Sequence, residues 1–350
     1  MNNPFTLSFG VLPDQFISRP ILNNRILDDF LSEKPSNRAY MITGVRGSGK
    51  TVMLTEIAKR IREYSEWIVV ELNPEEDLME ALVAKLYNLE KIKPLFVKAK
   101  INIGYGGSGI SLEKISPGIT GEVILEKMLN VLQKHNKRLL VTIDEAVNNH
   151  YIKSFAHSFQ IFVRKEYQVF LIMTGLYENL YNLQNEKTLT FLYRTPRIVL
   201  EPLNIMRVAD SYKSIFGISD PDAAEMAKLT KGYPFAFQLL GYIRWEHKNK
   251  SLKQLMPEYD QYLADYVYDK IWHELGDKDR KVVLEMAQHE DYIRIQTLRE
   301  AVGMNSSLFS SYRDKLIRKG IVDVSRYGYI GLILPRFCEY VTRRSEYDAI

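Results

Sequence analysis

The sequence predicts an α/β fold with a parallel sheet, followed by a helical segment and a small C-terminal domain of three helices and a β-hairpin. In residues 1–203, short apolar runs alternate with amphipathic helical patterns, which is typical of a parallel sheet covered by helices on both faces. Residues 204–276 contain helical patterns only, and residues 277–350 show three short helical patterns before two strands. We therefore expect three domains in the 350 residues, with boundaries after residues 203 and 276.

Five apolar runs predict the strands of the sheet. They are RAYMIT (38–43), WIVVELN (67–73), RLLVTID (138–144), QVFLIMT (168–174) and RIVLEPL (197–203). Between the first two runs, TVMLTEIAKRI carries its apolar residues at a helical period. Pro74 and the acids after it are expected to open the next helix, and Thr120 is expected to cap a further helix.

The C-terminal domain has the element order of a winged helix. Helices are expected over residues 279–288, 295–303 and 306–320, and strands over residues 321–326 and 329–334. Gly320 is placed to end the third helix.

A glycine-rich motif directly follows the first predicted strand. GVRGSGKT, at residues 44–51, matches G-x-x-x-x-G-K-[ST], and a helix is expected to begin near Lys50. Glycines let backbone amides curl around phosphate oxygens, while Lys50 suits the β and γ phosphates and the Thr51 hydroxyl suits Mg²⁺. A chance glycine-rich turn is the alternative, and the strand-loop-helix context argues against it. The residues expected to contact ATP or ADP are Gly44, Val45, Arg46, Gly47, Ser48, Gly49, Lys50, Thr51 and Val52.

An acidic pair ends the third predicted strand. In a magnesium–nucleotide site, Asp144 would hold the metal together with Thr51, and Glu145 would polarise the attacking water. A surface pair after a buried strand is the alternative. Because the upstream motif supplies the phosphate site, we favour hydrolysis of ATP, with Lys50 and Glu145 as catalytic residues. A small-molecule kinase is disfavoured, because the adjacent acids suit water activation.

Two further side chains are weaker catalytic candidates. Thr174 ends the fourth strand, where its hydroxyl would bond the attacking water, and Asn179 is a second candidate for that role. A threonine that simply ends a strand is the alternative. Arg194 precedes the fifth strand and would stabilise phosphoryl charge at the nucleotide of a neighbouring subunit in a homo-oligomer. For Arg194 the alternative is a solvated basic turn.

A second glycine-rich stretch, INIGYGGSGISLEK at residues 101–114, formally fits G-x-G-x-x-G. Its flanks alternate apolar and other residues, and no helix follows directly. These features predict an exposed β-hairpin insertion that contacts a partner, and they argue against a dinucleotide site.

With these motifs in place, the chain resembles the STAND-type P-loop ATPases, in particular the archaeal and bacterial Arch_ATPase group close to AAA+ initiator-type ATPases. The resemblance covers nearly the whole chain and rests on GVRGSGKT, VTIDEA, residues 173–203, GYPFAFQLLG and the C-terminal winged helix. It implies the sheet order 5-1-4-3-2, with the nucleotide at the carboxyl ends of the strands.

The resemblance also implies a helical lid over the nucleotide. In the family, a Gly-x-Pro motif lies in this lid, which makes Pro234 in Gly232-Tyr233-Pro234 a nucleotide contact. The family also carries an N-terminal F-x-G-R-x-x-E box that frames the nucleotide. Here Phe16 and Arg19 match the box, whereas Ser18 and Leu22 depart from it.

Two functions are consistent with these features. The first is a nucleotide-controlled switch, in which ATP or ADP alters the lid and the winged helix. The alternative is a DNA-binding AAA+-type ATPase whose third C-terminal helix offers Arg313 and Arg318 to duplex DNA. The net charge of +4 permits a nucleic-acid partner without arguing for one, and a protein partner of the winged helix is equally open.

Composition narrows the setting. Cys338 is the single cysteine, so no intrachain disulfide forms and a cytoplasmic location is expected. No apolar run approaches the roughly 20 residues that span a bilayer, so no membrane partner is expected. The six histidines and one cysteine show no spacing typical of a zinc site.

Overall fold

The computed structural model describes residues 2–8, 10, 12–101, 105–106, 109–110, 120–289 and 291–348. The chain forms two compact units. Unit 1 comprises Met1–Ser18, Gly44–Gly49 and Leu200–Ile350, and unit 2 comprises Arg19–Thr43 and Lys50–Val199. Residues 44–49, the glycine-rich loop, thus belong to unit 1, whereas the strand before the loop and the helix after it belong to unit 2.

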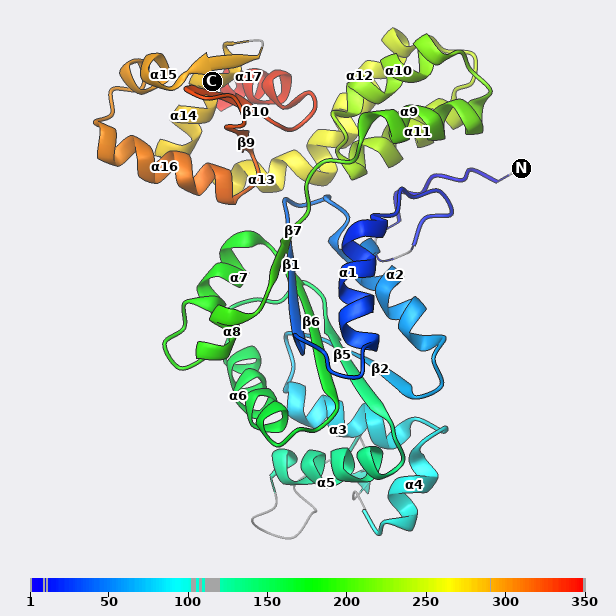
Figure 1. Cartoon of the computed structure of the whole chain (residues 1–350). Coiled ribbons are helices and arrows are strands. Elements are labelled where there is room, and N and C mark those ends of the chain that lie inside the picture. The colour runs from blue at the N-terminus through cyan, green and yellow to red at the C-terminus, as the bar shows by residue number, and fades with distance from the viewer. Residues whose placement is uncertain are drawn as a thin grey trace. The chain divides into compact units, whose positions relative to one another are not determined.

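Unit 2 is built on a five-stranded parallel sheet (Figure 1). The strand order is β2-β5-β6-β1-β7, and every neighbouring pair is parallel. Numbered along the chain, these five strands have the order 5-1-4-3-2, which confirms the predicted topology. The strands are β1 (Ala39–Thr43), β2 (Trp67–Leu72), β5 (Arg138–Ile143), β6 (Val169–Gly175) and β7 (Arg197–Val199).

Helices cover both faces of this sheet (Figure 1). On one face, Phe30 of α1 packs its ring against Tyr40 of β1 and Phe170 of β6. On the other face, alternate strand residues such as Met41 and Leu171 join a buried cluster with α3, α5, α6 and α7. The helices of unit 2 are α1 (Pro20–Leu31), α2 (Lys50–Arg62), α3 (Leu78–Asn88), α4 (Lys93–Lys98), α5 (Gly121–Lys134), α6 (His150–Arg164), α7 (Tyr177–Gln184) and α8 (Thr190–Arg194).

Three local predictions in unit 2 need correction. The helix after β2 begins at Leu78 instead of Pro74, because the Asp77 carboxylate caps the amides of Met79 and Glu80, each at 3.0 Å. Thr120 does precede α5, but its side chain makes no capping hydrogen bond. The fifth strand ends at Val199, four residues earlier than predicted.

The predicted hairpin at residues 101–114 is described only in part. β3 (Tyr105–Gly106) and β4 (Gly109–Ile110) pair antiparallel. The other residues of the hairpin, from 102 to 114, lie outside the described part of the chain.

Unit 1 contains the helical segment (residues 204–276) and the C-terminal segment (residues 277–348). Turns at Gly217 and Gly232 separate α9 from α10 and α10 from α11. The helical segment consists of α9 (Ile205–Phe216), α10 (Asp220–Thr230), α11 (Pro234–Glu246), α12 (Leu252–Leu263), a π-helical turn (Ala264–Tyr268) and α13 (Asp269–His273).

The C-terminal segment contains the three helices and the hairpin that the sequence predicted, and two elements that it did not. The additional elements are a short strand, β8, which completes a three-stranded sheet of order β8-β10-β9, and the final helix α17. The elements are α14 (Asp277–Ala287), β8 (Tyr292–Arg294), α15 (Ile295–Ala301), α16 (Ser306–Arg318), β9 (Val322–Asp323), β10 (Tyr329–Leu332) and α17 (Phe337–Asp348).

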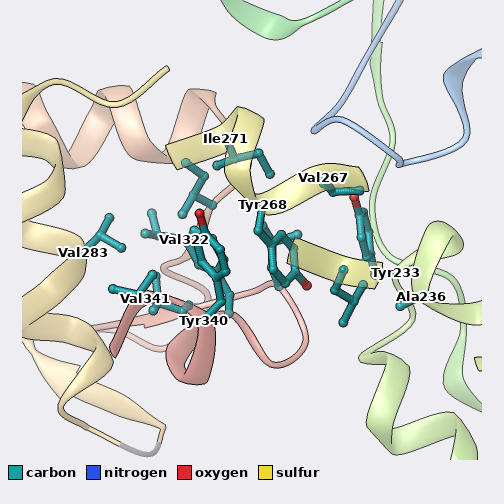
Figure 2. Close-up of a cluster of buried hydrophobic side chains, with 14 of the residues drawn as sticks. Tyr233, Ala236, Val267, Tyr268, Ile271, Val283, Val322, Tyr340 and Val341 are labelled. Atoms are coloured by element: carbon teal, nitrogen blue, oxygen red, sulfur yellow. The ribbon is translucent and has the colours of Figure 1, made fainter. Parts of the chain in front are cut away.

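The helical and C-terminal segments share one continuous buried cluster (Figure 2). Tyr268 lies at its centre, with its ring centroid 4.9 Å from that of Phe337 and 5.6 Å from that of Tyr340. The N-terminal residues join the same cluster, since Phe5 is 2% exposed and stacks on Phe216 at 5.8 Å. The contacts therefore place the helical and C-terminal segments in one compact unit.

Within the described residues, no helix combines the length and apolar character that crossing a membrane requires.

Candidate functional site

Three of the predicted site residues meet in unit 2, where β5 and β6 end side by side. Asp144 follows β5, Thr174 lies near the end of β6, and Thr51 is the second residue of α2. One carboxylate oxygen of Asp144, Oδ2, accepts a hydrogen bond from the Thr51 hydroxyl at 2.7 Å. Its other oxygen, Oδ1, accepts one from the Thr174 hydroxyl. The structure thus brings the two predicted metal ligands into direct contact.

Glu145 occupies an unusual backbone conformation beside this cluster. Its φ of 52° lies in the left-handed region, which costs a non-glycine residue free energy that contacts with its surroundings must offset. The Glu145 amide donates to Asp144 Oδ1 at 3.0 Å and to Thr174 Oγ1 at 3.3 Å. The Glu145 side chain itself is exposed.

The donor set fits a magnesium ion. A threonine hydroxyl and a carboxylate are hard oxygen ligands, and Mg²⁺ in nucleotide sites uses one or two such groups with water and phosphate oxygens completing its shell. In the described ranges, no three His, Cys, Asp or Glu side chains form a cluster that would hold a metal alone. Thr51 and Asp144 are thus suited to a metal that arrives with phosphate.

In unit 1, the glycine-rich loop is shaped by left-handed glycines. Gly47 has a φ of 76° and Gly49 a φ of 86°, and both conformations are costly for other residues. Gly47 is also closely approached, because an added Cβ would lie 2.2 Å from the hydroxyl oxygen of Tyr233. Ser48 is 3% exposed, and across the described ranges its hydroxyl has no hydrogen-bond partner. A phosphate oxygen would satisfy such a buried hydroxyl.

The helical segment binds the backbone of this loop. The Tyr233 hydroxyl donates to the Arg46 carbonyl, and the Phe235 amide donates to the Gly47 carbonyl at 3.2 Å. Burial raises the pKa of Tyr233, so its hydroxyl keeps the proton that it donates. Pro234 begins α11, and its Cβ would lie 3.8 Å from a Cβ added at Gly49, so the Gly-x-Pro motif does lie against the loop.

Two further contacts link the loop to the rest of unit 1. The Arg46 guanidinium forms an ion pair with Glu274 at 3.2 Å, next to α13. A Cβ added at Gly320, which follows α16, would lie 3.1 Å from the Cβ of Val45. The loop therefore contacts the C-terminal segment as well as the helical segment. The sequence does not indicate Tyr233, Glu274 and Gly320 as loop contacts, because no spacing pattern relates them to residues 44–49.

The other predicted residues lie in unit 2. Arg194 is the exposed last residue of α8, and Asn179 lies half-buried in α7. Arg19 precedes α1 and is half-buried. Lys50 and Val52 begin α2, and Lys50 is 8% exposed.

Comparison with solved structures gives the fold. The Walker-type ATPase Paby2304 of Pyrococcus abyssi superposes with a TM-score of 0.65 at 12% identity, covering 94% of this chain and 96% of that chain. The ORC2 protein of Aeropyrum pernix, solved in ADPNP–ADP complexes, has a TM-score of 0.59 at 14% identity, covering 94% and 93%. This is a P-loop NTPase fold.

Three further comparisons concern a third solved structure, a family model and curated proteins. Cdc6p of Pyrobaculum aerophilum superposes with a TM-score of 0.50 at 15% identity, covering 97% of both chains. A family model described as a domain of unknown function, DUF8462, matches residues 265–341, which include the C-terminal segment up to α17. No curated protein matches the sequence.

Proposed function

We propose that this chain is a Mg²⁺-dependent ATPase that acts as a nucleotide-controlled switch. One observation carries the catalytic part: the G-x-x-x-x-G-K-T motif supplies Thr51, and the Thr51 hydroxyl lies 2.7 Å from the Asp144 carboxylate. The superposed Walker-type ATPase of Pyrococcus abyssi has the same fold, which uses such a motif for phosphate. The proposed cofactors are ATP or ADP, with Mg²⁺ supplying charge neutralisation at the phosphates.

In this proposal each residue has one chemical task. Amides of the glycine-rich loop and the Lys50 ammonium bind the β and γ phosphates. Thr51 and Asp144 hold the metal, and the exposed Glu145 carboxylate takes up the proton of the attacking water.

The switch rests on the contacts of the loop within unit 1. Phosphate would bind to the amides of the glycine-rich loop. The loop carbonyls of Arg46 and Gly47 accept hydrogen bonds from the helical segment. A nucleotide that alters the loop backbone therefore alters these two bonds. A ligand shifts such an equilibrium only when it binds the two states unequally. We propose that ATP and ADP differ in this respect and so change the helical segment and the C-terminal segment, which we interpret as a winged helix.

Two substitutions test the ATPase. Lys50→Ala should abolish nucleotide binding, measured by isothermal titration calorimetry with MgATP. Glu145→Gln should bind MgATP as the wild type does and lose turnover, measured by phosphate release. Unchanged phosphate release by Glu145→Gln would refute the assignment of the base, and unchanged binding by Lys50→Ala would refute the phosphate site.

DNA binding through the C-terminal segment is a second candidate. It is favoured by the loop between β9 and β10, where Tyr327 is 100% exposed and the Arg326 guanidinium lies 4.1 Å from the Tyr329 ring centroid. Exposed aromatic and arginine side chains suit nucleic acid. On α16, however, Lys315 is paired with the buried Asp279 at 2.6 Å. This ion pair engages a cation that would otherwise be available to phosphate.

Salt dependence separates this candidate from the switch. A DNA-binding chain should bind a fluorescent duplex with an affinity that falls steeply as salt rises, and Arg313→Ala with Arg318→Ala should weaken that binding. Absence of duplex binding at physiological ionic strength would leave the C-terminal segment to a protein partner.

We also propose that Arg194 acts at a neighbouring subunit. Arg194 is exposed between two exposed apolar residues, Tyr193 at 74% and Val199 at 50%. Sizing by light scattering with MgATP tests this proposal. ATP-dependent assembly that Arg194→Ala leaves intact, with turnover lost, would support it. A monomer under all conditions would exclude it.

A further inference from the structure

We propose that Thr174 is a positioning residue that fixes the turn carrying Asp144 and Glu145, a role different from contact with the attacking water. The inference rests on the proposed function, because Asp144 matters here as the ligand of Mg²⁺. It concerns how the chain prepares that ligand before any nucleotide is bound.

Thr174 bonds three successive residues of the turn. Its hydroxyl donates to Oδ1 of Asp144 and accepts from the amide of Glu145 at 3.3 Å. Its carbonyl accepts from the amide of Ala146 at 2.7 Å. One residue of β6 thereby sets the side chain of Asp144 and the backbone of the two residues after it.

The hydroxyl has no donor left for water or phosphate in this arrangement. A threonine hydroxyl carries one hydrogen and two acceptor lone pairs. The hydrogen is used by Asp144, one lone pair is used by the Glu145 amide, and Thr174 is 0% exposed. A direct bond to the γ phosphate would require Thr174 to abandon the carboxylate that the proposed metal needs.

The surrounding backbone keeps this geometry in place. Thr174 is paired with Ile42 of β1, and the residue before it, Met173, is paired with Ile143 of β5. The residue after it must be small, since a Cβ added at Gly175 would lie 2.9 Å from the carbonyl oxygen of Ala146. The left-handed φ of Glu145, 52°, is then held by hydrogen bonds from a rigid strand end.

Metal dependence is the first test. Binding of N-methylanthraniloyl-ATP would be titrated with Mg²⁺ for the wild type, Thr174→Val and Thr174→Ser. Loss of a group that orients a metal ligand typically weakens metal affinity about 10- to 100-fold. We expect Thr174→Val to raise the half-saturating Mg²⁺ concentration by that factor, and Thr174→Ser to restore it.

A matched control comes from the neighbouring strand. Thr43 ends β1, is 0% exposed, and its hydroxyl has no hydrogen-bond partner anywhere in the described chain. Thr43→Val therefore removes a buried hydroxyl without removing a hydrogen bond, and should leave the Mg²⁺ dependence unchanged. If Thr174→Val lost turnover with an unchanged Mg²⁺ dependence, Thr174 would contact the water and the positioning role would be refuted.

Amide exchange tests the positioning role without nucleotide or metal. In the metal-free protein, the peptide covering residues 141–149 should exchange faster in Thr174→Val than in the wild type, in Thr174→Ser and in Thr43→Val. Equal exchange in all four would overturn the inference. Failure of the wild type to bind the nucleotide analogue at any Mg²⁺ concentration would refute the proposed function instead, and the exchange result would still decide the role of Thr174.

Discussion

Replacing Tyr233 with phenylalanine should loosen the glycine-rich loop while leaving the fold intact. The ring of Tyr233 is 4% exposed and packs in the cluster of unit 1, and phenylalanine keeps that packing. The substitution removes only the hydroxyl that donates to the Arg46 carbonyl. The Phe235 amide remains on the Gly47 carbonyl at 3.2 Å, so one of the two loop bonds survives.

The expected size follows from the strength of one hydrogen bond. A buried neutral hydrogen bond contributes about 0.5–1.5 kcal/mol net. Since about 1.4 kcal/mol corresponds to a tenfold change in an equilibrium constant, the population of the open loop should rise about 2- to 12-fold. Amide exchange of the peptide containing residues 44–49 should accelerate by that factor in the nucleotide-free protein.

Tyr212→Phe is the matched control. The Tyr212 hydroxyl also donates to a backbone carbonyl, that of Phe237 at 2.8 Å, and Tyr212 is 0% exposed. Tyr212→Phe should lower the free energy of unfolding, measured with urea, about as much as Tyr233→Phe does. It should not accelerate amide exchange in the glycine-rich loop. Equal exchange of residues 44–49 in Tyr233→Phe and the wild type would refute the coupling of this hydroxyl to the loop.

Three other outcomes are expected. Gly232→Ala should lower the free energy of unfolding by about 3 kcal/mol or more in a urea titration. The reason is that Gly232 has a φ of 70° and that an added Cβ would lie 2.3 Å from the Leu203 carbonyl oxygen. A loss below about 1 kcal/mol would contradict this. Arg336→Ala should lower the free energy of unfolding by about 3 kcal/mol, the lower end for a broken buried pair, because Asp260, 7% exposed, loses its 2.7 Å partner and retains Arg343 at 3.8 Å. An unchanged urea midpoint would count against the pair. The free energy of unfolding should also fall as pH rises above the ordinary tyrosine pKa of 10.0, because burial raises the pKa of four tyrosines and the unfolded chain therefore ionises first. The expected loss is up to about 1.4 kcal/mol per pH unit for each residue. An unfolding midpoint that did not change between pH 9 and pH 11 would contradict this. These tyrosines are Tyr212, Tyr233, Tyr259 and Tyr268.

The strands of the sheet, and the contact of Asp144 with Thr174 at its edge, were predictable because local patterns determine them. Apolar runs mark the buried strands, and polar residues directly after β5 and β6 must meet where parallel neighbours end. Asp144 and Thr174 are in contact for that reason. The order of the strands came from the resemblance to a family, since composition and periodicity do not determine pairing.

Other features depend on contacts between residues far apart in the chain. The bond from Tyr233 to Arg46 joins residues separated by 187 positions, and no periodicity relates them. The start of α3 was misjudged because proline is compatible with a first helical turn, whereas the carboxylate of Asp77 determines where the helix begins. The role of Thr174 depends on the direction of one hydroxyl, which a sequence does not contain.

The most direct test of the switch is amide exchange in the helical segment under different nucleotides. Glu145→Gln would be compared without nucleotide, with MgADP and with MgATP, following peptides that cover residues 232–246. We predict protection that differs between MgADP and MgATP, because the loop proposed to bind phosphate is bonded to Tyr233 and Phe235. Protection confined to residues 44–54, with residues 232–246 unchanged by either nucleotide, would contradict it.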